Sequence, residues 1–187
     1  MKRLSLATLI LFSSIFLLSF ASKAQVYNTS IGIRAGSIIG ITAGSIQGIT
    51  YKKFIDDPND KSKVLKSWEI HGGYRYGQSI NNKLGFFRGY GVDGFYTYNN
   101  ALSPMLLLHY GYGAGIAFAD NSYAINPKAL GLTTGLTGIV GMEYVFKGAI
   151  ISLDFSFIPR LDVLYLGEIK PAIQLLAGAL SIKYIIN

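Results

Sequence analysis

Side chains of alternating character recur along most of this chain, and this alternation restricts its fold more than any other feature. Between residues 68 and 76, aromatic, aliphatic and glycine residues take every second position, and Glu69, His71 and Arg75 lie between them. Successive side chains of a β-strand point to opposite faces of a sheet, so a repeat of two predicts strands rather than helices. The repeat is present in eight segments, at residues 31–36, 48–52, 68–76, 89–98, 106–118, 132–146, 151–157 and 176–186.

The eight segments predict a single all-β domain over residues 25–187. Turn-like sequences separate several of them, at residues 56–61, 99–104, 121–127 and 147–148. An even number of such strands suits an eight-stranded antiparallel up-and-down β-barrel. After residue 24 no apolar run reaches the roughly 18 residues of a membrane-spanning helix, which excludes a helical membrane bundle.

The first 24 residues have a different character. A short basic start is followed by an uncharged apolar run at 4–20, and then by small residues at Ser22 and Ala24. This order predicts a secretory signal peptide over residues 1–24, cleaved before Gln25, and the alternative is a permanent membrane-anchor helix. Cleavage would leave 14 basic and 10 acidic residues, a net charge of +4, without a basic stripe of the kind that binds nucleic acid. The absence of cysteine excludes disulfides, thiolate metal sites and a thiol nucleophile.

The distribution of bulky and small side chains predicts which face of the barrel points outward. One face of each segment carries bulky apolar residues without a charge, whereas the opposite face carries glycines, alanines and a few charged groups. A soluble barrel buries its apolar face, but a transmembrane barrel turns that face to lipid. Half of the chain is apolar and only 14% is charged, which is low for a water-facing surface. We therefore expect a transmembrane barrel, and the alternative is a soluble lipocalin-like periplasmic barrel.

The chain also resembles a known family over essentially its whole length after the signal peptide. The stretches that carry the resemblance are IGIRAG at 31–36, Gly-Tyr-Arg-Tyr at 73–76, GYGAGIAF at 111–118, GIVGMEYVFKG at 138–148, SLDFSFIP at 152–159 and LSIKYI at 180–185. They are similar to the small eight-stranded outer-membrane barrels of Gram-negative bacteria, of the OmpA/OmpX-like kind. The resemblance implies location in the cell outer membrane, with outer-membrane lipid, lipopolysaccharide and the barrel-assembly machinery as partners. Such strands usually end in an aromatic residue, whereas this chain ends in Asn187 and has Tyr184 nearby.

Charged residues fall on the inward face of the predicted barrel. An eight-stranded barrel has an interior just wide enough for side chains to fill it. Charges there are costly unless they are paired, and the presence of four bases, four acids and two histidines predicts a satisfied structural network. Asp154 and Lys183 fall on neighbouring segments and are placed to pair. The network comprises Arg34, Lys52, Glu69, His71, Arg75, Asp93, His109, Glu143, Asp154 and Lys183.

A lipid-modifying enzyme is the principal alternative function. Some outer-membrane barrels are lipid hydrolases with a serine–histidine pair, but neither His71 nor His109 has a serine two residues on, and alternation turns both inward. A metal site built from His71, His109 and Glu69 is geometrically feasible, but we expect neither a metal nor a cofactor. The predicted function is a non-enzymatic structural or interaction role at the cell envelope.

The predicted external loops are short, at residues 37–45, 77–85, 119–131 and 159–170. None exceeds 13 residues, which is too little for a large receptor or plug. The loop groups available to lipopolysaccharide or to an envelope protein partner are Asn81, Asn82, Lys83, Tyr123, Lys128, Arg160, Asp162, Glu168 and Lys170.

Overall fold

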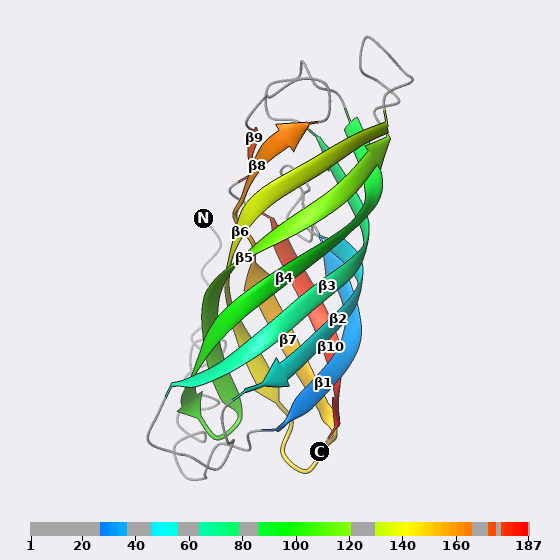
Figure 1. Cartoon of the computed structure of the whole chain (residues 1–187). Coiled ribbons are helices and arrows are strands. Elements are labelled where there is room, and N and C mark those ends of the chain that lie inside the picture. Colours follow the sequence, from blue (N-terminus) through cyan, green and yellow to red (C-terminus); the bar gives the residue numbers. More distant parts are fainter. Residues whose placement is uncertain are drawn as a thin grey trace, which may run out of the picture.

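Long antiparallel strands wind around a common axis and close into a tilted barrel (Figure 1). The computed structural model describes residues 27–36, 46–55, 64–78, 86–120, 130–165, 172–174 and 177–186. The predicted signal peptide, the loop predicted at 37–45 and the turns predicted at 56–61 and 121–127 lie outside these residues. So do the predicted loop groups Asn81, Asn82, Lys83, Tyr123, Lys128, Glu168 and Lys170. No helix among the described residues is long and apolar enough to cross a membrane.

The strands begin and end at the following residues: β1 Thr29–Gly36, β2 Ile46–Phe54, β3 Leu65–Gln78, β4 Phe86–Ser103, β5 Leu106–Asp120, β6 Leu130–Val145, β7 Ile151–Phe157, β8 Arg160–Tyr165, β9 Ala172–Gln174 and β10 Gly178–Ile186.

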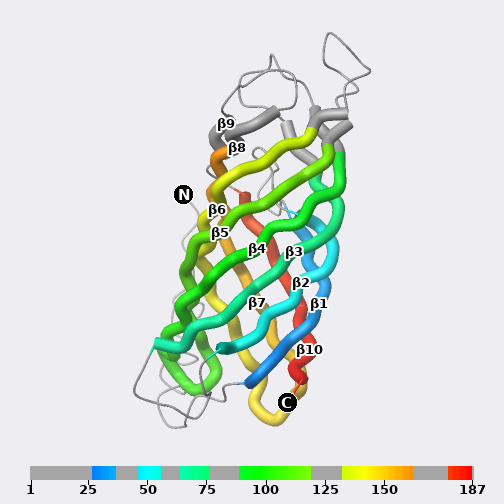
Figure 2. The backbone as a smooth tube through the Cα atoms, in the orientation of Figure 1, coloured from blue at the N-terminus to red at the C-terminus, as the bar shows by residue number. Residues whose placement is uncertain are grey.

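The sheet closes on itself through antiparallel pairs (Figure 2). Neighbouring strands follow the order β5-β4-β3-β2-β1-β10-β7-β6, and β5 also pairs with β6, which completes the ring. β8 follows β7 along the same edge of β6, and β9 pairs with β8 as β10 pairs with β7. β7 with β8, and β9 with β10, therefore each form one wall strand with an interruption. The prediction of an eight-stranded antiparallel up-and-down barrel is confirmed.

The loop predicted at 159–170 is wrong in its first part, because only a short interruption separates β7 from β8. Pro159 has no N–H with which to extend the ladder. Its carbonyl nevertheless accepts a 2.8 Å hydrogen bond from the Gly138 amide, and pairing with β6 resumes at Arg160. Residues 160–165 are therefore strand rather than loop, because the proline removes one donor without ending the strand.

The turn predicted at 99–104 is also shorter than expected. β4 runs through most of it, and only Pro104 and Met105 connect it to β5. Asn99 is 1% exposed and points into the barrel, where its side-chain amide donates a 2.9 Å hydrogen bond to Ser67 Oγ. Asparagine usually favours turns, because its side chain can bond to the nearby backbone. Here the side chain bonds to a buried acceptor on the neighbouring strand, so Asn99 remains part of β4.

Two short turns lie at the same end of the barrel as the last residues of β10, the lower end in Figure 1. One is the connection of β4 to β5. The other is the predicted turn at Lys147 and Gly148, where Gly148 has a φ of 71°, a left-handed conformation that favours glycine.

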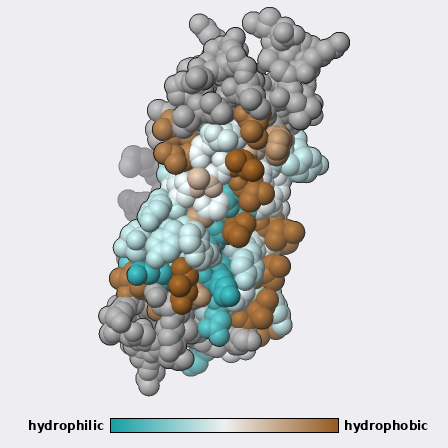
Figure 3. All heavy atoms as spheres, viewed as in Figure 1, coloured by the Kyte–Doolittle hydropathy of each residue, from teal (hydrophilic) through white to brown (hydrophobic). Residues whose placement is uncertain are grey.

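The pleat gives the wall two faces of opposite character. Bulky apolar residues point outward, for example Ile33, which is 68% exposed, and Leu136, which is 62% exposed. Figure 3 shows apolar residues along the wall of the face in view, with the strongly hydrophilic ones gathered toward its lower part. The inward positions of the same strands carry buried polar and charged side chains. The bulky faces identified from the sequence are therefore the outward faces of the described strands.

Two apolar clusters occupy parts of the interior. The end cluster comprises Tyr27, Phe54, Leu65, Leu107, Val145 and Ile185. The middle cluster comprises Phe95, Ile139 and Ile158. Along β6 the inward positions run from Val145 of the end cluster through Glu143 to Ile139 of the middle cluster. Along β6 the interior is therefore stratified, with Glu143 between two apolar clusters, and further charged residues lie past the middle cluster, at Asp93 of β4 and Arg160 of β8.

Candidate functional site in the barrel interior

The ten charged and histidine side chains predicted for the interior are all buried in the structure. None is more than 3% exposed, and the highest value belongs to Arg34. They come from eight different strand elements, β1 to β7 and β10. Because every second side chain of a strand points inward, residues that are distant in the sequence meet across the lumen.

Lys183 of β10 is the centre of the network. Its ammonium group lies 3.1 Å from Glu69 Oε1 and 3.8 Å from Glu143 Oε2, and it also donates to Asp154 Oδ2. The pairing of Asp154 with Lys183 follows from adjacency, since β7 and β10 run side by side. The two other carboxylates reach Lys183 from β3 and β6, strands that do not border β10.

Glu143 of β6 collects a second set of donors. Lys52 Nζ donates to its Oε2 at 2.9 Å. The hydroxyls of Tyr27 and Ser152 each donate to its Oε1 at 2.6 Å. Neither hydroxyl is among the site residues predicted from the sequence. Ser152 could have been found from the sequence, because it lies two residues before Asp154 in β7 and so points inward as well. Tyr27 precedes β1, and no strand alternation in the sequence indicates that it points inward.

The two histidines have different surroundings. His71 Nε2 lies 2.9 Å from Glu69 Oε1, which also accepts a 3.3 Å hydrogen bond from Thr50. His109 Nε2 lies 3.8 Å from Asp154 Oδ1, beyond hydrogen-bond distance, and neither of its ring nitrogens has a hydrogen-bond partner. A Cβ atom at Gly141 would lie 2.7 Å from His109 Nε2, so a glycine is needed there for the imidazole to keep its place.

A separate ion pair joins Asp93 of β4 to Arg160 of β8. The sequence predicts Arg160 in an external loop, but its strand turns it inward, where it is 3% exposed. A Cβ atom at Gly115 would lie 2.8 Å from the Arg160 guanidinium, so this pair also depends on a glycine. Among the described residues the interior therefore holds five buried bases and four buried acids, and the predicted balance of four with four is wrong.

Neutral groups complete the network around Arg34. Its guanidinium donates to Ser181 Oγ at 3.1 Å and to Ser156 Oγ at 3.0 Å. These two serines share the inward phase of Lys183 and Asp154, two positions away on the same strands. Neither serine is among the residues predicted for the network, which are charged residues and histidines alone. Arg75, the remaining predicted base, is 1% exposed.

The described residues do not bring a serine to either histidine. His71 bonds to a carboxylate through Nε2, while its Nδ1 and both nitrogens of His109 have no partner. A serine nucleophile needs its base within about 2.6–3.2 Å, although that distance is often longer without substrate. The geometry is that of a packed network of ion pairs and hydrogen bonds.

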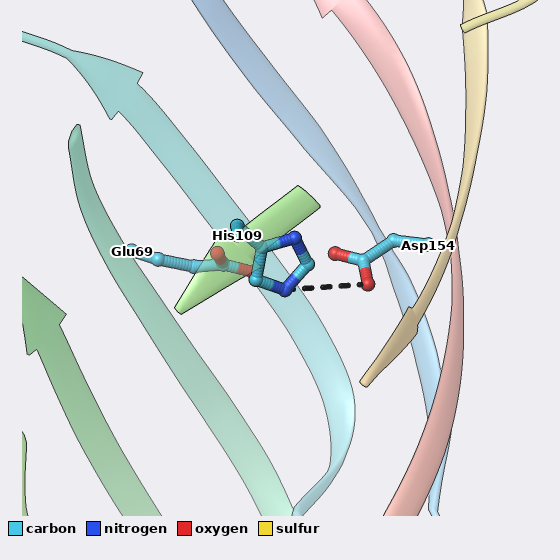
Figure 4. A group of neighbouring side chains, drawn as sticks. All are labelled: Glu69, His109 and Asp154. Carbon is cyan, nitrogen blue, oxygen red and sulfur yellow. Dashed lines mark ion pairs between the residues drawn. The ribbon is translucent and has the colours of Figure 1, made fainter. Parts of the chain in front are cut away.

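The residues that are best placed to hold a metal ion differ from the trio considered in the sequence analysis. Glu69, His109 and Asp154 each offer one ligand atom, and the three atoms lie within 4.8 Å of one another. Figure 4 shows the three side chains pointing toward one another from separate strands. His71 is not part of this group, although it bonds to Glu69.

The fold and the interior together define a class of protein, the closed eight-stranded antiparallel barrel with a packed, charged lumen. No family model matches the chain, and no curated protein or solved structure matches it either.

Proposed function

We propose that this protein is a non-enzymatic outer-membrane β-barrel of the OmpA/OmpX-like kind, with a filled lumen and a structural or interaction role at the cell envelope. One observation carries the proposal. The outward wall is made largely of exposed apolar side chains, while nine charged side chains of the described strands are buried inside, and the exposed lysines Lys53 and Lys66 lie near strand ends. A membrane barrel has this distribution, and a barrel dissolved in water has the reverse.

The extent of the exposed apolar surface supports a lipid environment. Among the residues that the structure describes, twenty-five large hydrophobic side chains are exposed, and they include Tyr90 at 71%, Ile33 at 68% and Tyr112 at 63%. Contiguous apolar surface on this scale is uncommon on soluble monomers, where it promotes association. In a bilayer the same surface contacts lipid acyl chains and is not exposed to water, so it does not promote association.

The content of the lumen supports a structural role over transport. The ion pairs around Lys183 lie beyond the end cluster along β6 and β10, and the middle cluster follows them along β6. An eight-stranded barrel is just wide enough for side chains to fill it, whereas aqueous porins need about 16 to 18 strands. A continuous water path is therefore not expected.

The other parts of the proposal come from the sequence. A signal peptide at 1–24 would direct export, and the barrel-assembly machinery, lipid and lipopolysaccharide would be the partners of a chain of this class. A further envelope protein could bind the external loops. A lipid-modifying enzyme and a soluble lipocalin-like periplasmic barrel are the alternatives that the test below addresses.

A charge placed on the outer wall separates a membrane barrel from a soluble one. Leu136 lies within β6 and is 62% exposed, so arginine there would face lipid in one case and water in the other. In a bilayer the substitution costs about 2–4 kcal/mol near the midplane and about 0–1 kcal/mol near the interface. We expect Leu136→Arg to reduce the amount of assembled barrel in outer-membrane fractions. The matched control, Phe146→Arg just after the same strand, should have little effect.

The wild-type protein should fractionate with the outer membrane and migrate differently in detergent gels before and after boiling. Recovery from the soluble periplasmic fraction, with both arginine variants equally tolerated, would instead support the lipocalin-like alternative. An enzyme would be indicated by hydrolysis of outer-membrane lipid by the purified barrel and loss of that activity in His71→Ala or His109→Ala without loss of folding.

A further inference from the structure

Three side chains in the lumen, those of Glu69, His109 and Asp154, converge on one place. Among the described residues, Glu69 Oε2, Asp154 Oδ1 and both ring nitrogens of His109 have no hydrogen-bond partner. The three side chains are fully buried, at 0% exposure. Buried polar atoms in proteins are nearly always satisfied, so unsatisfied atoms on three converging side chains indicate an occupant. Figure 4 shows that they approach one another from three strands.

The neighbouring donors use the opposite oxygens of the same carboxylates. Lys183 contacts Glu69 Oε1 and Asp154 Oδ2, and His71 also contacts Glu69 Oε1. The unpartnered atoms are the second oxygen of each carboxylate. Each of these two carboxylates therefore keeps one oxygen that is not bonded to Lys183.

Three carboxylates gather around this place. Ion pairs among the described residues connect Glu69, Glu143 and Asp154 with the ammonium groups of Lys52 and Lys183. The nearby Arg34 donates to two serine hydroxyls and to none of these carboxylates. The described interior as a whole holds five bases and four acids, so the attraction for a cation lies in the free carboxylate oxygens and not in a net negative charge.

We propose that Glu69, His109 and Asp154 bind one divalent metal ion of the zinc class inside the barrel. One imidazole nitrogen and two carboxylate oxygens form a ligand set that zinc accepts, at distances of about 2.0–2.2 Å. The ligand atoms lie within 4.8 Å of one another, and His109 Nε2 lies 3.8 Å from Asp154 Oδ1. Small side-chain rotations would bring them around a single ion, with a water molecule as the fourth ligand. Gly141 provides the space that the imidazole needs for this position.

The position of the site determines how the ion would enter. Its charged region is bounded along β6 by the end cluster and the middle cluster. The ligands come from β3, β5 and β7, so the site is complete only when the barrel has closed. Metal binding of this kind is coupled to folding. The ion is therefore taken up during folding, and a chelator added afterwards removes it slowly.

The test measures zinc in protein that has been unfolded in urea and refolded in detergent micelles with ZnCl2, followed by removal of free metal. We expect about one zinc per chain for the wild type and less than a tenth of that for His109→Gln. The control is Thr97→Val, which removes a buried lumen hydroxyl that bonds to Ser67 and to none of the three proposed ligands, and which should keep the wild-type zinc content. Refolding with EDTA should give metal-free protein, whereas EDTA added to the folded, loaded barrel should leave most of the zinc in place after an hour.

An X-ray absorption spectrum of the loaded wild type makes the test independent of how the variants fold. It should show one imidazole and otherwise oxygen ligands. Absence of zinc in the refolded wild type would overturn the proposal and leave a buried water as the occupant. Equal zinc in His109→Gln, or a spectrum without imidazole, would overturn it as well. These results do not depend on membrane location, so they separate this proposal from the proposed function.

Discussion

Replacing Lys183 by methionine tests whether the lumen is held together by its ion pairs. The substitution keeps most of the side-chain volume but removes the ammonium that contacts Glu69, Glu143 and Asp154. Breaking a buried ion pair from one side costs about 3–5 kcal/mol, because it leaves an uncompensated charge. Three carboxylates lose a partner here, and only Glu143 keeps another lysine, Lys52. We therefore expect a loss in the free energy of unfolding at the upper part of that range.

Urea unfolding in detergent micelles, followed by tryptophan fluorescence, measures this loss. The chain has one tryptophan, Trp68, which packs edge-on against Tyr96 on the outer wall, with ring centroids 5.2 Å apart. With a urea dependence of about 2 kcal/mol per molar, the midpoint should fall by about 2 M. Lys53→Met is the matched control, since Lys53 is exposed on β2 and should shift the midpoint little.

A second substitution checks the electrostatic cause. Asp154→Asn added to Lys183→Met removes one of the stranded carboxylates, so the double variant should recover part of the lost stability. If Lys183→Met and Lys53→Met differ by less than about 0.5 kcal/mol, the reasoning is refuted, because surface substitutions have effects of that size.

Four further outcomes are expected. Gly115→Ala should destabilise the barrel by up to about 3 kcal/mol in urea unfolding, because its Cβ would displace the Asp93–Arg160 pair, whereas Gly94→Ala, which has nothing within 4 Å, should be neutral. Phe95→Ala should cost about 3–5 kcal/mol in the same assay, since it empties the centre of the middle cluster. Purified protein in planar bilayers should show no stable nanosiemens-scale openings, and reproducible openings would contradict a filled lumen. Intact mass should correspond to a chain that starts at Gln25, and retained N-terminal residues would contradict the signal peptide.

The orientation of the wall follows from the sequence because the pleat has a fixed period. On β5, Tyr110 and Tyr112 are 43% and 63% exposed, while His109, directly before Tyr110, is fully buried in the interior. A phase error of one residue would reverse every side chain, so one clear segment fixes the faces of the whole strand. The closed barrel follows in turn from the count of such strands.

The interior is only partly predictable, because its contacts join strands that are not neighbours. Tyr27 lies before β1, at a position where the phase set by Ser30 would point it outward. It instead packs edge-on against Phe54 at 5.1 Å and reaches Glu143 with its hydroxyl. The inward position of Arg160 could not be predicted for a different reason. Pro159 suggests the end of a strand, and a sequence pattern does not reveal that the ladder continues past it.

The sequence separation of the interior contacts has a consequence for how the barrel forms. The bonds of Lys183 to Glu69 and of Lys52 to Glu143 join residues 114 and 91 positions apart, and Tyr27 reaches Glu143 across 116. The first strand, β1, also pairs with the last, β10. High contact order slows folding, because the entropy of closing long loops must be lost before the contacts form. A chain that lacks β10 would leave the carboxylates of Glu69 and Asp154 without their lysine. Pairing of the lumen charges and closure of the strand ring therefore both depend on β10 and form together. We expect a barrel without β10 in place to have little of the stability of the complete barrel.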